Sequence, residues 1–86
     1  GAQMNLLVDA NMYVLHLKDF SALGLCGLTG APLAPDQNVV VFLTDDQPVP
    51  LQIRWIRRTL IGASFFERLS DETMQRLLRL YARSRK

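Results

Sequence analysis

The stretch NVVVFLTDDQPVPLQIRWIRRTLIGASFFE, residues 38–67, holds three consecutive runs of strand-like sequence. The first run, residues 38–44, is rich in β-branched and aromatic side chains and is apolar on both faces, which predicts a central strand. Residues 45–48, DDQP, predict a turn in which Asp45 and Asp46 are solvated.

The second run alternates between apolar and polar positions, which is typical of a strand with one buried and one solvated face. The side chains expected on the buried face are Val49, Leu51, Ile53 and Trp55, and those expected on the solvated face are Gln52, Arg54 and Arg58. The third run, residues 60–67, predicts a last strand, in which Gly62 would tolerate a bulge or a close backbone approach.

The chain before this stretch supplies three more short strands. Residues 5–9 and 12–18 predict a hairpin joined through Ala10 and Asn11, with His16 on its outer face. A brief strand at residues 25–28 is followed by a loop rich in glycine and proline.

The sequence from Ser70 onward predicts a helix instead. Ser70 is a good N-cap, and Asp71 and Glu72 lie in the first turn, where the helix dipole favours anions. Leu69 is expected to pack back onto Met74. The apolar face of the helix is expected to consist of Met74, Leu77, Leu78 and Tyr81.

Together these elements predict a mainly β fold: a six-stranded antiparallel barrel over about residues 4–67 and one C-terminal amphipathic α-helix over about residues 71–84. A closed barrel suits several short apolar strands because it leaves no sheet edge exposed. The helix is expected to pack against the barrel or to cover one open end. If it does neither, its leucine face becomes the surface of a homodimer.

Length and composition indicate an ordinary folded domain. With 86 residues the chain can bury one modest core, so we expect a single domain over residues 1–86 or a piece of a larger protein. The formal net charge of +2 is too small to indicate binding to a polyanion. No apolar run approaches the roughly 20 residues of a membrane span and no signal peptide is visible, so we expect a cytoplasmic protein or domain.

The sequence offers little for catalysis. The single Cys26 and the single His16 cannot build a metal site, and Cys26 is expected to be a small buried hydrophobe. No catalytic pair or phosphate-binding glycine loop is visible, since Asp45 and Asp46 are explained as turn residues. We therefore expect no enzyme, no catalytic residues, no metal and no cofactor.

The segment DFSALG, residues 19–24, has two interpretations. In the first it is a structural turn, because Asp19 and Ser21 can bond nearby backbone amides and Gly24 can adopt a positive φ. In the second it binds a ligand. Asp19 and Ser21 would then face one side and accept hydrogen bonds from the N1 and N2 groups of guanine, while Gly24 lets a flat ligand approach the backbone.

DFSALG has the form of the Asp/Asn-x-Ser-x-x-Gly motif of the PilZ domain family, which is known for bacterial receptors of cyclic di-GMP. The resemblance continues in APLAPDQNVVVFL around the central strand, in IRWIRRTLIGASFFE with its Gly-x-x-Phe, and in LSDETMQRLLRLYAR as a closing helix. It covers roughly residues 5–83.

This resemblance implies a PilZ-type six-stranded barrel with a C-terminal helix and a role in nucleotide binding and second-messenger signalling, such as the control of motility or biofilm formation. It also implies that Asp19 and Ser21 contact a guanine edge and that Gly24 permits close approach. A protein partner is expected to receive the signal.

The chain departs from the family pattern at one point. Family members that bind cyclic di-GMP also carry an Arg-x-x-x-Arg motif before the first strand, whereas no arginine precedes Arg54 here. Two explanations stay open: the arginines stand upstream in a longer native protein, or this is a divergent domain that has lost the ligand. Arg54 and Arg58, expected on one outward strand face, are candidates to contact phosphate instead. A solvated strand face is the preferred explanation for these two arginines, because arginine is so often simply exposed.

Two functions therefore stay open. One is a PilZ-type module that binds cyclic di-GMP and relays the signal through protein contacts. The other is a degenerate PilZ domain that does not bind the nucleotide and acts as a protein-protein interaction module. Binding to single-stranded nucleic acid is disfavoured, because Trp55 is expected on the buried face and the other aromatic side chains are scattered.

Overall fold

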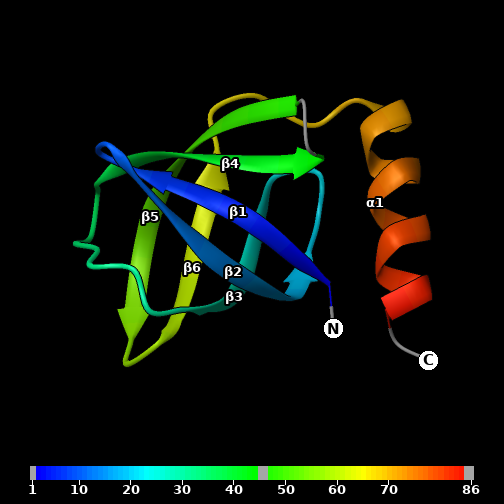
Figure 1. Cartoon of the computed structure of the whole chain (residues 1–86). Coiled ribbons are helices and arrows are strands. Elements are labelled where there is room, and N and C mark those ends of the chain that lie inside the picture. The colour runs from blue at the N-terminus through cyan, green and yellow to red at the C-terminus, as the bar shows by residue number, and fades with distance from the viewer. Residues whose placement is uncertain (1, 45–46, 85–86) are drawn as a thin grey trace.

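The computed structural model describes residues 2–44 and 47–84, which form six β-strands followed by one α-helix (Figure 1). The strands are β1 (Gln3–Val8), β2 (Asn11–Phe20), β3 (Gly24–Thr29), β4 (Asn38–Thr44), β5 (Gln47–Arg57) and β6 (Leu60–Phe65), and the helix is α1 (Asp71–Ser84). This confirms the predicted mainly β fold with a C-terminal helix.

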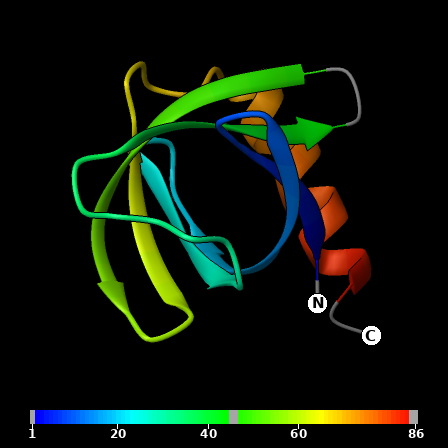
Figure 2. The ribbon, with the colours of Figure 1, turned by 60° about the vertical axis from the view of Figure 1, so that its left-hand side comes forward.

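The six strands form a closed antiparallel barrel in the order β1-β2-β3-β6-β5-β4. Because β1 also pairs with β4, each strand has a neighbour on both sides, as the prediction of a barrel without exposed edges requires. The strands curl around one interior in Figure 2, and α1 stands outside them.

Alternate strand positions fill the interior. In β1, Met4, Leu6 and Val8 are buried while Gln3 and Asn5 are exposed, as the two-residue period of a strand requires. Strand β2 follows the same rule up to Leu17 and leaves His16 exposed, as predicted. The most completely enclosed barrel side chains are Leu6, Val8, Leu15, Val41, Leu51, Ile53 and Ile61.

A β-bulge breaks the alternation near the end of β2. Leu17 pairs with Gly27 in β3, but the next pair is Asp19 with Cys26, so Lys18 is an extra residue. Without it, Asp19 would follow Leu17 toward the core. The bulge instead places the Asp19 carboxylate on the outer face of the barrel, where it is exposed.

A second bulge, in β5, overturns the prediction for Trp55. Ile53 pairs with Ala63 in β6 and Trp55 pairs with Gly62, so Arg54 is the extra residue. The alternation slips by one position, and Trp55 lies on the outer face with 44% of its surface exposed. The inward position passes to Ile56, which packs against the core.

Helix α1 begins as predicted. The hydroxyl oxygen of Ser70 accepts a hydrogen bond from the backbone N–H of Thr73 at 3.2 Å, which is the geometry of an N-cap. Leu69 is buried, and Met74 packs against the same core cluster, as expected for the residues on either side of the cap. No helix within residues 2–44 and 47–84 is long and apolar enough to cross a membrane.

The helix packs against the barrel, which was one of its two predicted positions. The Tyr81 hydroxyl donates a hydrogen bond to the backbone carbonyl of Lys18 at 3.0 Å, and the Tyr81 ring meets Phe20 edge-on with centroids 5.8 Å apart. Leu77 is buried, with 2% exposed. Leu78 was predicted on the same face but is 47% exposed, because successive helix residues are rotated by about 100°.

Several boundaries differ from the prediction. The first hairpin turns at Asp9 and Ala10, with Asp9 at φ 55°, because β2 already begins at Asn11. Gln47 and Pro48 belong to β5 rather than to a turn, while Asp45 and Asp46 lie outside the described residues. Strand β6 ends at Phe65, two residues earlier than expected.

Candidate ligand-binding site

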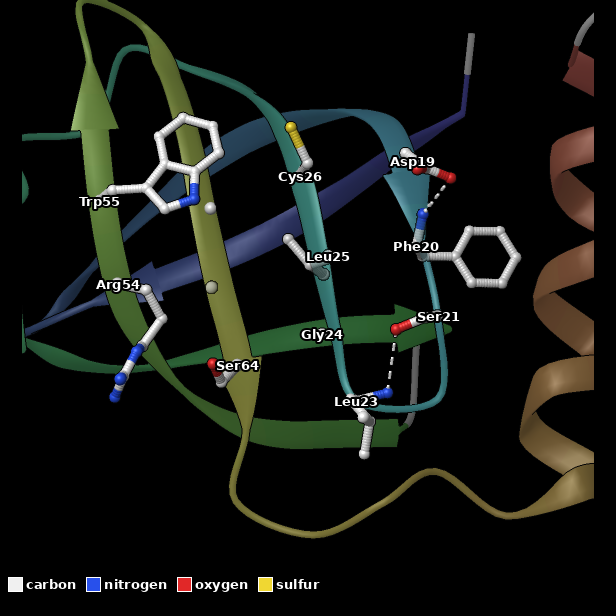
Figure 3. Close-up of a pocket in the computed structure, with 12 residues that line it drawn as sticks. Asp19, Phe20, Ser21, Leu23, Gly24, Leu25, Cys26, Arg54, Trp55 and Ser64 are labelled. Carbon is white, nitrogen blue, oxygen red and sulfur yellow. Dashed lines mark hydrogen bonds between the residues drawn. The ribbon is translucent and has the colours of Figure 1, made fainter.

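An open pocket of about 370 Å³ lies on the outer face of the barrel, over the ends of β2 and β3 and across β6 to β5 (Figure 3). It contains the predicted residues Asp19, Ser21, Gly24 and Arg54. The other residues that line it are Phe20, Leu23, Leu25, Cys26, Trp55, Gly62, Ala63 and Ser64.

Strand pairing explains how residues distant in sequence come together here. Asp19 pairs with Cys26, Cys26 with Gly62, and Gly62 with Trp55. These four residues form one row across β2, β3, β6 and β5, with a carboxylate at one end and an indole at the other. The two bulges bring both ends of the row to the outer face.

The acidic end of the row is formed by the DFSALG turn. Oδ1 of Asp19 accepts the backbone N–H of Phe20 at 2.9 Å, and Oγ of Ser21 accepts that of Leu23 at 3.1 Å. Both side chains are exposed. Within the described part of the chain, Oδ2 of Asp19 and the Ser21 hydroxyl proton have no partner, so the turn retains hydrogen-bonding groups that can meet a ligand.

Gly24 does not have the positive φ that the structural-turn interpretation allowed. None of the described glycines has a positive φ, so Gly24 is not needed for a left-handed turn. It pairs with Ser64, and a Cβ at Gly24 would collide with the backbone carbonyl oxygen of Ala63. The close approach of β6 therefore accounts for a glycine at this position, whether or not a ligand binds.

The two candidate arginines are separated by the structure. Arg54 is exposed, lines the pocket and donates from Nη1 to Oε1 of Gln52 at 2.9 Å. Arg58 lies in the turn between β5 and β6 with φ 59°, and it is not among the pocket residues. The expectation that both share one outward strand face is wrong, because β5 ends at Arg57.

Sequence reasoning missed three residues of the pocket floor and wall. Trp55 was expected to be buried, Cys26 was expected to be a core residue but is only half-buried, and Ser64 was given no role. Gly62 was the one available signal, since it was predicted to allow close approach. A Cβ there would collide with the Trp55 indole, so the group that approaches closely is a side chain rather than the backbone that was expected.

The described residues show no cluster of three or more His, Cys, Asp or Glu side chains that could hold a metal ion. The pocket offers hydrogen-bond acceptors from Asp19 and Ser21, a guanidinium from Arg54 and an aromatic ring from Trp55. Such a set suits an organic ligand that combines a polar edge, a flat ring and an anionic group.

Comparison with models of protein families identifies the family of this chain. The family model of the PilZ domain matches residues 2–83, which is nearly the whole sequence. The chain belongs to the PilZ domain family. PilZ domains are binding and signalling modules, and the closed six-stranded barrel with one C-terminal helix agrees with that membership. Searches of curated proteins and of solved structures find no match.

Proposed function

We propose that this PilZ domain binds cyclic di-GMP in the pocket at the DFSALG turn and relays the bound state through protein contacts. One observation carries the proposal. The motif residues Asp19 and Ser21 are exposed at one end of an open pocket that extends to Arg54, in a chain that the PilZ family model matches over residues 2–83.

The chemistry of the ligand fits the groups on this face. Guanine presents N1–H and N2–H donors, which suit the free carboxylate oxygen of Asp19, and the Ser21 hydroxyl can donate to or accept from the same base. The two phosphates of the ligand are anionic, and a guanidinium such as that of Arg54 binds phosphate oxygens with charge-assisted hydrogen bonds.

The absence of an Arg-x-x-x-Arg motif from this chain lowers the affinity for cyclic di-GMP that we expect. Two arginines of an Arg-x-x-x-Arg motif, at about 1 to 3 kcal/mol each, would contribute roughly one to four orders of magnitude in Kd. Arg54 replaces one such contact at most. We therefore expect this chain to bind more weakly than family members that carry the complete motif.

The relay is proposed to run through the other residues of the same turn, Phe20, Ala22 and Leu23. The backbone carbonyl of Ala22 accepts the N–H of Leu69 at 2.9 Å, and that of Leu23 accepts the N–H of Phe65 at 2.9 Å. Phe20 contacts Tyr81 in α1. A ligand that reorders Asp19 and Ser21 thus acts on the residues that hold the end of β6 and the helix, and it can change a docking surface there.

The second candidate is an interaction module without a nucleotide. It is favoured by exposed apolar side chains near the turn and on the helix, namely Leu23, Phe66, Leu78 and Leu80, which are 40% to 62% exposed. The local hydrogen bonds of Asp19 and Ser21 also account for these residue types without a ligand. In this case a partner would bind the same whether cyclic di-GMP is present or absent.

The indole of Trp55 is exposed, so the predicted burial of Trp55 is no longer a reason against binding to single-stranded nucleic acid. Binding to single-stranded nucleic acid still requires several aromatic rings that can stack on bases. Phe20 already packs against Tyr81, and Phe66 lies outside the pocket, so among the described residues of the pocket Trp55 is not accompanied by such rings. The site favours a small nucleotide.

Isothermal titration with cyclic di-GMP tests the proposal, on this 86-residue chain and on the full-length native protein. At protein concentrations of about 100 μM we expect saturable heat from the wild type. Asp19→Ala should weaken the binding of cyclic di-GMP. Glu67→Ala, which removes an exposed carboxylate outside the pocket, should leave the binding unchanged. Absence of heat with both proteins leaves the interaction module as the function.

A further inference from the structure

Trp55 is the single tryptophan of the chain, and its position is unusual for so large an apolar side chain. The bulge at Arg54 turns it outward, and 44% of its surface is exposed. The position of the indole is nevertheless set by its packing on Gly62. A Cβ at Gly62 would overlap three atoms of the indole, Nε1, Cε2 and Cζ2, so the ring occupies the space that a glycine leaves open.

Figure 3 shows the indole spread over β6 from its attachment on β5, with a ring face turned away from the barrel. The inner side of the indole rests on the Gly62 backbone. Its outer side faces the pocket, where the neighbouring positions on β3 and β6 carry the small side chains of Cys26 and Ser64. Trp55 therefore combines a rigid support with an open aromatic face, which is what base stacking requires.

The length of the row indicates the size of the ligand. Asp19 and Trp55 lie at opposite ends of a row that crosses four adjacent strands. At about 4.8 Å between neighbouring strands, their backbones are roughly 14 Å apart. A single purine that pairs with Asp19 leaves the indole uncovered, whereas a ligand with two bases can engage both ends.

We propose that Trp55 is a base-stacking residue of this site: its outward face takes one purine base of a cyclic dinucleotide while Asp19 and Ser21 bind the edge of the other. This inference rests on the proposed function and adds a residue to the site. Gly62 is a positioning residue, because it acts only by seating the indole. Arg54, next to Trp55 in β5, lines the same pocket and is the cationic group proposed to contact a phosphate of the ligand.

The proposal can be tested without any substitution, because the only tryptophan is the reporter. Titration with cyclic di-GMP should change the Trp55 fluorescence saturably, with the same Kd that calorimetry gives. GMP, which has one base, should compete more weakly and change the fluorescence less at equal occupancy. Heat of binding together with unchanged fluorescence would overturn the stacking role but leave the nucleotide-binding function intact.

Variants make the test quantitative. Trp55→Ala should raise the Kd by roughly 5- to 150-fold, the usual effect of removing a stacking ring, and Trp55→Phe should retain most of the affinity. Phe66→Ala is the matched control, since Phe66 is 55% exposed but lies outside the pocket, and it should bind like the wild type. A calorimetric Kd of Trp55→Ala equal to that of the wild type contradicts the proposal.

Gly62→Ala tests whether Gly62 affects ligand binding through the position of the Trp55 indole or through a general effect on the structure. It should weaken binding in the wild-type background and cause no further loss in the Trp55→Ala background, because its effect passes through the indole. An equal loss in both backgrounds would show that Gly62 acts independently of Trp55. If calorimetry shows no binding to the wild type at all, the nucleotide function and the stacking role fail together.

Discussion

Gly24→Ala should destabilise the barrel even when no ligand is present. In the structure the new Cβ would collide with the carbonyl oxygen of Ala63, which belongs to the backbone of β6 and cannot rotate away. Overpacking of this kind costs about 1 to 3 kcal/mol. For a domain of this size, each kcal/mol lowers the Tm by about 4 to 8 °C, so we expect a decrease of roughly 4 to 24 °C.

Thermal unfolding followed by circular dichroism, without nucleotide, measures this effect. Gly30→Ala is the matched control, because nothing lies within 4 Å of a Cβ at that position and no described glycine has a positive φ. It should unfold at or slightly above the wild-type Tm, since alanine lowers the entropy of the unfolded chain. If Gly24→Ala unfolds at the temperature of Gly30→Ala, the packing explanation of the motif glycine is refuted.

The remaining predictions concern the helix. Ser70→Ala removes the cap on the Thr73 N–H and should lower the unfolding free energy by about 0.5 to 2 kcal/mol in a urea titration, and an unchanged midpoint would refute the capping role. Leu77→Ala should cost about 2 to 5 kcal/mol because this side chain is 2% exposed. Leu78→Ala, at 47% exposed, should stay within about 0.5 kcal/mol of the wild type, and equal losses for the two leucines would contradict the observed docking of α1.

Much of the fold could be predicted from local patterns. The two-residue alternation in β2 identified Leu15 and Leu17 as core residues and His16 as exposed, because a strand with one buried face requires it. The helix start was predictable because a cap depends on one side chain, Ser70, and on the amides that follow it. A closed barrel followed from the number of short apolar strands.

The two bulges could not be predicted in the same way. Nothing in the sequence around Lys18 or Arg54 marks either as the extra residue, since a bulge depends on the register of the partner strand. A slip of one position exchanges the two faces of a strand. The alternation therefore placed Trp55 in the core, although the structure puts it in the pocket.

The candidate site was predicted only in part for the same physical reason. Asp19, Ser21 and Gly24 lie within one segment, residues 19–24, and could be recognised as one motif. The opposite side of the pocket is built by cross-strand neighbours from β5 and β6, which no local pattern reveals. Arg58 was grouped with Arg54 because the sequence does not show where β5 ends.

The central claim is that cyclic di-GMP binds on the face between the DFSALG turn and Trp55. Amide chemical-shift mapping on the isotope-labelled chain tests it most directly. We predict that the shifts that change on titration cluster at Asp19, Ser21, Cys26, Gly62 and the Trp55 indole N–H, with smaller changes passing to Leu69. Shifts that stay constant at a saturating nucleotide concentration, or that change only on the opposite side of the barrel around Val14 and Phe42, would contradict it.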